Sequence, residues 1–69
     1  MPLTLAEIGE KNIIRKIGGK QEVKAHLENL GFNVGGVVTV VSAIGGSVIV
    51  NVKDSRIAVS REMAQRIMV

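Results

Sequence analysis

Apolar and polar side chains alternate in two neighbouring stretches of the chain, which predicts two β-strands over residues 36–42 and 47–53. Val38 and Val40 share one face of the first stretch, and Val48 and Val50 share one face of the second. A loop at residues 43–46 connects them as a hairpin, and a tight turn at residues 53–56 leads into a further strand that ends near residue 59. The alternation predicts that these four valines fill the interior.

A different period precedes the hairpin and predicts the one substantial helix, over about residues 20–30. Val23, Leu27 and Leu30 stand at positions i, i+4 and i+7, so they form one stripe that would face the core. Gly31 follows the last apolar residue directly. Because glycine adopts left-handed backbone conformations without steric cost, we expect Gly31 to end the helix and turn the chain sharply.

The two ends of the chain carry weaker signals. Thr4 and Glu7 have the spacing of a capping box, and Leu3 and Ile8 that of a hydrophobic staple, so a capped helical turn is expected there. Residues 12–17 predict a first strand, which we expect to be bulged because its isoleucines do not alternate cleanly. Near the other end, we expect Ser60 to cap a second short helical turn, and residues 67–69 to return as a last strand beside the first.

This order of elements predicts a mainly β fold. The expected architecture is a small, partly open barrel of five strands, with one α-helix inserted after the first strand and short helical turns near both ends. The 69 residues suffice for one domain, expected to span residues 1–69. A chain of this size buries only about 60% of the surface that its unfolded form exposes, so its core is thin.

Composition and charge exclude several classes of partner and site. The net charge is +3, but lysines and carboxylates are interleaved and no basic run appears that would neutralise adjacent phosphates. Phe32 is the single aromatic residue, whereas proteins that bind single-stranded nucleic acid stack bases on several rings. We therefore expect no nucleic-acid partner. The absence of cysteine excludes disulfides and thiolate metal sites and favours a reducing, cytoplasmic location.

Residues 29–52 lack charge and are numerous enough to cross a bilayer as a helix. Five glycines interrupt this window, among them Gly31 and Gly35, and β-branched residues stand between them. Each pair of glycines delimits a short strand, so the window predicts a hairpin and the G-x-x-x-G is coincidental. No basic region followed by a long apolar stretch marks a secretory signal near the N-terminus. We expect no direct insertion into a membrane.

The middle and the end of the chain carry more specific motifs. The helix ends in L-x-x-L-G-F-x-x-G, over residues 27–35, and the fourth strand reads R-I-A-V-S-R-x-x-A, over residues 56–64. In this order and over nearly the whole chain, the sequence resembles the FeoA family of small cytoplasmic proteins associated with bacterial ferrous iron uptake. The same domain occurs at the C-terminus of DtxR-type metal-dependent repressors. One departure is that Asp54 and Ser55 stand where the family commonly has a glycine, and aspartate tolerates a left-handed turn.

The resemblance implies an SH3-like barrel that acts as an accessory or regulatory partner of FeoB, a large iron permease with a cytoplasmic GTPase domain. The residues themselves agree that the protein is not an enzyme. The chain has one histidine, His26, and one aspartate, Asp54, and they assemble no catalytic triad or carboxylate pair. Gly19 and Lys20 do not belong to a phosphate-binding loop, because Ile14 and Gln21 replace its earlier glycine and its Ser or Thr.

A second function, that of a direct transition-metal sensor or metallochaperone, rests on two residues. Glu22 and His26 stand four residues apart on one helix face, and a carboxylate and an imidazole can share a metal ion. Two ligands make a weak site, because ferrous selectivity usually requires three or more nitrogen or oxygen ligands, and the favoured interpretation is that both side chains are solvated surface groups. We expect no cofactor, beyond weak binding of Fe²⁺ if that pair is used.

The remaining candidate chemistry is a surface for another protein. A proline-rich peptide would need an aromatic-lined groove, which one phenylalanine cannot provide. If the inward valines fill the barrel, other aliphatic residues of the hairpin point outward in excess of what a monomer needs. Phe32 is better interpreted as a core residue beneath the helix corner. The contact with FeoB, or with a second copy of the chain, is expected to involve Leu30, Phe32, Val37, Val41, Ile44 and Ile49.

Overall fold

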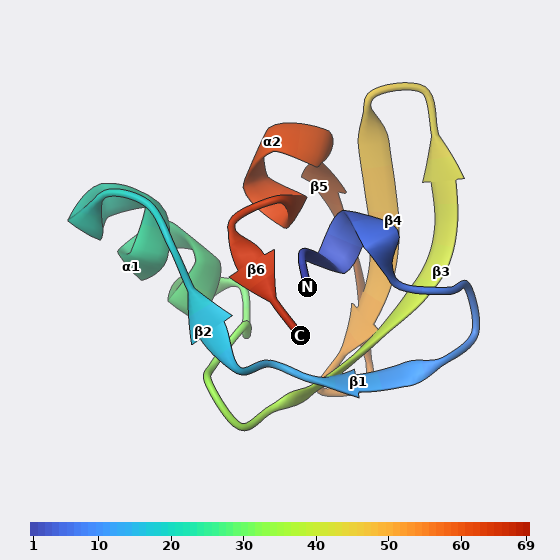
Figure 1. The fold of residues 1–69 in the computed structure, drawn as a ribbon, viewed down its shortest axis with the longest axis horizontal. Coiled ribbons are helices and arrows are strands. Elements are labelled where there is room, and N and C mark those ends of the chain that lie inside the picture. Colours follow the sequence, from blue (N-terminus) through green and yellow to red (C-terminus); the bar gives the residue numbers. More distant parts are fainter.

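The computed structural model describes residues 1–69 and confirms the predicted fold class, with a mainly β domain that carries one α-helix and two shorter helical segments (Figure 1). An antiparallel sheet of four strands has the order β1-β3-β4-β5, and β2 pairs with β6 in a second, smaller sheet. The elements are η1 (Leu3–Leu5), β1 (Lys11–Ile13), β2 (Lys16–Ile17), α1 (Gln21–Asn29), β3 (Val37–Ile44), β4 (Ser47–Val52), β5 (Ser55–Ser60), α2 (Arg61–Ala64) and β6 (Ile67–Met68).

The predicted first strand is divided between the two sheets. Ile14 still pairs with the large sheet, since its N–H donates to the Gly36 carbonyl at 2.9 Å and its carbonyl accepts from Gly35 at 2.8 Å. The next amide, of Arg15, donates instead to the Met68 carbonyl at 2.7 Å. The predicted bulge is therefore wrong. The irregularity between Ile14 and Arg15 is the point where the chain leaves one sheet and joins the other. The last strand does lie beside this part of the chain, as predicted.

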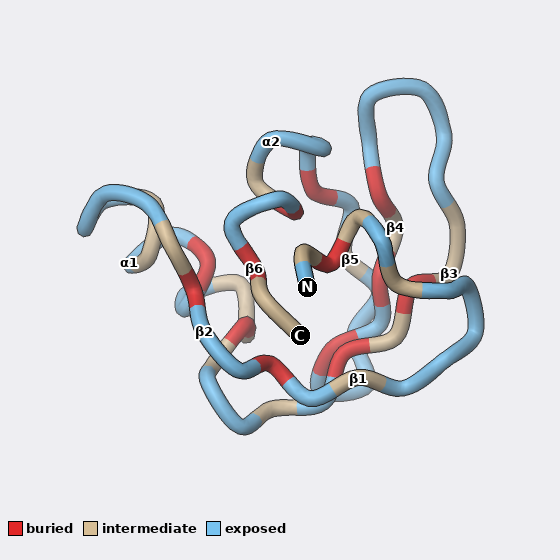
Figure 2. The backbone as a smooth tube through the Cα atoms, in the orientation of Figure 1, coloured by how far each residue is buried: buried red, intermediate tan, exposed pale blue.

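Thirteen buried residues, all of them apolar, form one core between the two sheets (Figure 2). The four inward valines predicted from alternation are confirmed, since none is more than 4% exposed. The core contains Leu3, Ile14, Ile17, Leu27, Phe32, Val38, Val40, Val48, Val50, Val52, Val59, Ala64 and Ile67. Most of α1 remains exposed, with Leu27 as its one buried residue. Burial of this thin core is the main apolar contribution to stability.

The predicted helix corner is confirmed. The N–H of Gly31 donates to the Glu28 carbonyl and that of Phe32 to the Leu27 carbonyl, each at 3.0 Å. These two bonds define a Schellman motif, which satisfies carbonyls that a helix end otherwise leaves without partners. Gly31 has φ +107°, a conformation that side chains with a Cβ rarely adopt. Phe32 and Leu27 are both fully buried and supply the apolar contact of the motif.

The first helical turn is placed correctly, but its predicted cap is wrong. Segment η1 begins at Leu3 after Pro2, and no side chain caps it. Leu3 is buried whereas Ile8 is 64% exposed, so the two residues do not form a staple. Two backbone bonds, from Leu5 to Pro2 and from Ala6 to Leu3, close this short 3₁₀ turn before a capping glutamate could reach it.

The conformations of the remaining turns agree with the residue types that form them. Gly45 and Gly46 make a two-residue loop between β3 and β4. Lys53 and Asp54 make the next one, with φ +49° and +62°, so an aspartate does occupy a left-handed position here. Ser60 caps α2 as predicted, accepting the Met63 N–H at 3.2 Å. The uncharged window that could have been a membrane helix forms the β3–β4 hairpin, and no helix is long and apolar enough to cross a bilayer.

Candidate functional site

The outward face of the four-stranded sheet holds most of the side chains predicted to contact a partner. Register places Val37 and Thr39 on this face, because Val38 and Val40 point into the core. A β-bulge lies between Val40 and Ser42, so an extra residue, Val41, is inserted in β3 opposite β4. Because of the extra residue, two successive side chains of β3, those of Val41 and Ser42, face outward, and the inward–outward alternation resumes after them.

The apolar end of this face, defined here as Val41, Ile44 and Ile49, lies at the tip of the β3–β4 hairpin. The apolar end spans the strands β3 and β4, and Ile49 pairs with Ser42 on one side and with Ala58 of β5 on the other. Ile44 is 64% exposed, while Val41 and Ile49 are half-buried. These three residues form the aliphatic surface that the sequence predicted.

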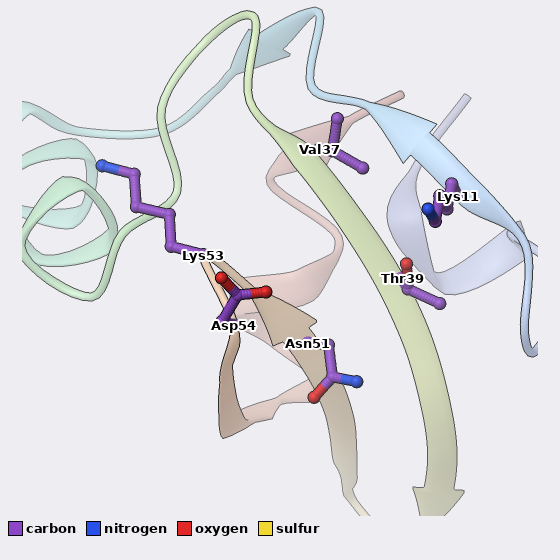
Figure 3. A pocket seen from close by; sticks show the side chains of 6 residues that line it. All are labelled: Lys11, Val37, Thr39, Asn51, Lys53 and Asp54. Carbon is purple, nitrogen blue, oxygen red and sulfur yellow. The ribbon is translucent and has the colours of Figure 1, made fainter.

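A polar hollow of about 500 Å³ lies beside the apolar end on the outward face, and Val37 is its one apolar lining residue (Figure 3). Lys11, Thr39 and Asn51 stand side by side across β1, β3 and β4, and the β4–β5 turn closes the hollow. In Figure 3 the Lys53 ammonium group extends toward α1 and away from the other lining side chains. Val37 pairs instead with Ile13, which is 60% exposed, so it belongs to a second and smaller apolar pair.

The sequence carries a signal for this hollow, but only once the register is known. Thr39 and Asn51 are polar residues that stand between valines in β3 and β4, and both are in the outward phase. That they face each other and Lys11 depends on pairing between strands far apart in the sequence.

Two residues of the predicted contact surface lie elsewhere. Phe32 is fully buried, which confirms the core interpretation and removes its side chain from any surface. Leu30 caps α1 and is half-buried against the core. Both residues sit near the β4–β5 turn, since a Cβ on Gly31 would lie 3.7 Å from the Val52 side chain. The apolar end is at the opposite end of β4, so the predicted patch is not continuous.

The candidate metal ligands are both on the exposed surface of α1. Glu22 lies in its first turn and His26 in its last, and neither is buried. No group of three or more histidine, cysteine, aspartate or glutamate side chains lies close enough together to hold a metal ion. If this helix takes up a metal ion, the ion would need further ligands from water or from another molecule.

A second hollow, of about 380 Å³, opens on the inner side of the sheet between η1, the hairpin and α2. Seven of its ten lining residues are apolar, and Leu5 and Ile8 at its rim are 68% and 64% exposed. Sequence reasoning missed this hollow because it assigned Ile8 to the staple. The exposed side chains of η1 are the local signal that there is no staple.

No polar or charged residue of the chain is buried, and the larger hollows are open on the surface. The surface offers sheet face, strand edges and exposed aliphatic side chains, and contiguous exposed aliphatic side chains are a common mark of interaction sites.

Comparison with known proteins identifies the family. The FeoA domain model matches residues 1–69, and the chain belongs to the FeoA family. It is 37% identical over 68 residues to Fe(2+) transport protein A of Methanocaldococcus jannaschii, which covers 99% of this chain and 83% of the relative. The protein is thus a member of a ferrous iron transport family.

Solved structures agree. A crystal structure of the iron uptake regulatory protein FeoA superimposes with a TM-score of 0.90 at 29% identity, over 99% of this chain and 90% of that one. A manganese-dependent transcriptional repressor superimposes with a TM-score of 0.88 at 14% identity, over 97% of this chain and 39% of the repressor. The second match shows the shared SH3-like fold alone.

Proposed function

We propose that the chain is a non-enzymatic accessory protein that binds the cytoplasmic, GTPase-bearing part of a FeoB-type ferrous iron permease. Membership of a ferrous iron transport family supports the transport role. The observation that carries the binding role is the apolar end of the outward sheet face, where three aliphatic residues lie together near the tip of the β3–β4 hairpin. A cytoplasmic location follows from the partner.

The apolar end favours protein contact on energetic grounds. Each Å² of apolar surface removed from water contributes roughly 25 cal/mol before the entropy of association is subtracted. Half-buried residues such as Val41 and Ile49 are already ordered by the strands that carry them, so their immobilisation on binding loses little entropy. The neighbouring polar hollow supplies hydrogen-bonding groups for the rim of such a contact.

The test is binding of the purified chain to the soluble GTPase domain of the permease, measured by calorimetry. Ile44→Lys places a charge on the exposed tip and should weaken binding at least tenfold with little change in the melting temperature. Val41→Lys should do the same, with a larger effect on the fold because Val41 is half-buried. Unchanged affinity in both variants would reject this surface.

Leu5→Lys is the matched control. Leu5 is as exposed as Ile44, but it lies on η1 beside the inner hollow rather than on the outward face. The control should bind the GTPase domain like the unaltered chain. If Leu5→Lys alone abolishes binding, the contact surface is the inner hollow instead.

The alternative function is direct binding of Fe²⁺ as a sensor or metallochaperone. Glu22 and His26 on α1 are the residues that favour it. Titration of the isolated chain with Fe²⁺ separates the two functions, because tight binding that depends on both side chains would support the alternative and weaken the binding-module proposal. Association with a second copy would appear as an apparent mass that rises with concentration when the isolated chain is sedimented.

A further inference from the structure

The outer edge of β5 is an unpaired strand edge. β5 is the last strand of the four-stranded sheet and pairs only with β4. The N–H of Arg61, just beyond β5, donates to the Gly46 carbonyl of the β3–β4 loop at 2.9 Å. Backbone groups of an antiparallel strand alternate between its two sides, so Ser55, Ile57 and Val59 pair with β4 as Arg61 does. The N–H and C=O groups of Arg56 and Ala58 therefore point away from the sheet, and neither residue forms a backbone hydrogen bond outside the β4–β5 pairing. The N–H of Ser60 points the same way, but Ser60 is the N-cap of α2 and its C=O accepts the first hydrogen bond of that helix.

The two edges of this sheet are protected very differently. At the other edge, β1 has three residues, and the chain then leaves to pair with β6. β5 has six residues in continuous register with β4, with no bulge and no proline. Arg56 is its only charged residue. Short length, bulges, proline and several charges are the usual means of blocking an edge, and β5 uses almost none of them.

The inner side of the same edge is incompletely covered. Ile57 pairs with Val50, which is fully buried, yet Ile57 itself is only half-buried. A residue on an added strand, opposite Ile57, would point inward and cover the isoleucine. On the outer side, Arg56 forms none of the side-chain hydrogen bonds in the structure, so its guanidinium group is available to a carboxylate.

We infer that the β5 edge binds an extended segment of another protein as an added antiparallel strand, with an apolar residue opposite Ile57 and an acidic residue opposite Arg56. Main-chain hydrogen bonds to Arg56, to Ala58 and to the N–H of Ser60 provide affinity, and the two side-chain positions provide specificity. The edge lies beyond the residues assigned above to the permease contact, and it accepts such a segment whatever protein supplies it.

A second copy of the chain fits the edge less well. Six residues make a strand about 20 Å long, so one edge offers at most a few hundred Å², whereas stable protein pairs bury roughly 800 Å² on each side. With Ala58 opposite Ala58, a symmetric β5–β5 pair would bring Arg56 against Ser60 and leave the guanidinium group without a carboxylate. The net charge of +3 likewise favours an acidic partner over a copy of the same chain.

The probe is the capped hexapeptide acetyl-Thr-Val-Thr-Val-Glu-Thr-amide, titrated into the whole isotope-labelled chain and followed by amide chemical shifts. In antiparallel register its second valine lies opposite Ile57 and its glutamate opposite Arg56. We expect saturable binding below about 1 mM, with the largest shifts in β5. Replacing the glutamate by lysine should weaken binding severalfold.

Two methylated peptides make the matched pair. A methyl group on the amide nitrogen of the central threonine removes the donor that faces Ala58, and it should weaken binding at least tenfold. The same methyl group on the second valine lies on the side away from β5 and should leave most of the affinity. Equal affinity of the two peptides, or equal loss in both, would overturn the proposal.

Two protein variants complete the test. Ala58→Pro removes an outward N–H that the fold does not use, so the chain should still fold but lose the peptide. Arg56→Glu should bind the lysine peptide more tightly than the glutamate peptide, which reverses the preference of the unaltered chain. This second variant keeps the test valid even if Ala58→Pro does not fold. The inference would be contradicted if Arg56→Glu kept the original peptide preference or if no peptide bound saturably. It would also be contradicted if the β5 amide shifts depended on protein concentration without peptide, because the edge would then bind a second copy of the chain.

Discussion

Single residues fix the corners of this molecule. Gly31 has φ +107°, and a Cβ there would meet no atom closer than 3.7 Å, so the constraint on this position comes from backbone conformation and not from space. Its role was predictable from sequence because a glycine directly after an apolar helical stripe is the commonest way for a helix to end. The positive φ of Lys53 was not predictable, since lysine has no preference for it and the tight hairpin imposes it.

Gly31→Val should therefore lower the free energy of unfolding by more than about 1 kcal/mol, because valine strongly disfavours this backbone conformation. Gly46→Ala is the control, since Gly46 has no left-handed φ and open space at its Cβ position. Chemical denaturation should show a small change for the control. An unaltered midpoint for Gly31→Val would mean that the corner is not constrained as described.

His26→Ala should leave both stability and any affinity for Fe²⁺ unchanged. The side chain is exposed on α1 and belongs to no group of three or more metal-ligating residues. The two measurements are a thermal melt and a calorimetric titration with Fe²⁺ under anaerobic conditions. A tenfold loss of affinity would favour the metal-binding alternative over the binding module.

At the scale of elements, the existence and type of most segments were predictable, whereas their connections were not. The α1 stripe and the alternating valines of β3 and β4 are strong periodic signals, and both were confirmed. The predicted first strand failed at Ile14 and Arg15, because successive amides there bond to different sheets. The bulge at Val41 was missed, since alternation alone does not show which strand carries an extra residue.

The α2 cap gives a direct test at this scale. Ser60→Ala removes the acceptor of the Met63 N–H bond and should lower stability by about 1 kcal/mol. Ser60→Asp should preserve most of it, since aspartate is an equally good cap. Equal loss in both variants, measured by urea denaturation, would show that the cap contributes little.

At the scale of the whole molecule, the small β2–β6 sheet is the other half of the core. Ile17 and Ile67 pair across this sheet and are both buried. The two ends of the chain are joined by a hydrogen bond of 2.7 Å, which the Val69 N–H donates to the Met1 carbonyl. This closure accounts for a core shared by residues distant in sequence. The predicted contact residues Val37, Val41, Ile44 and Ile49 do lie on the outward face, but Phe32 is buried and Leu30 lies at the end of α1, because the grouping of such residues depends on how the sheets pack.

Ile67→Ala should destabilise the entire domain by about 2–5 kcal/mol, because it leaves a cavity between the two sheets. Unfolding should remain a single transition, with the helix signal and the tertiary signal lost together. Selective loss of β6 while the large sheet stays folded would contradict the single core described here.

The most direct test of the proposed binding role is a pair of titrations of the isotope-labelled chain, one with the soluble GTPase domain of the permease and one with Fe²⁺. We expect saturable shifts on addition of the GTPase domain, centred on Val41, Ile44 and Ile49, and only weak, unsaturated effects of Fe²⁺ on α1. Tight Fe²⁺ binding centred on Glu22 and His26, with no response to the GTPase domain, would contradict the binding role.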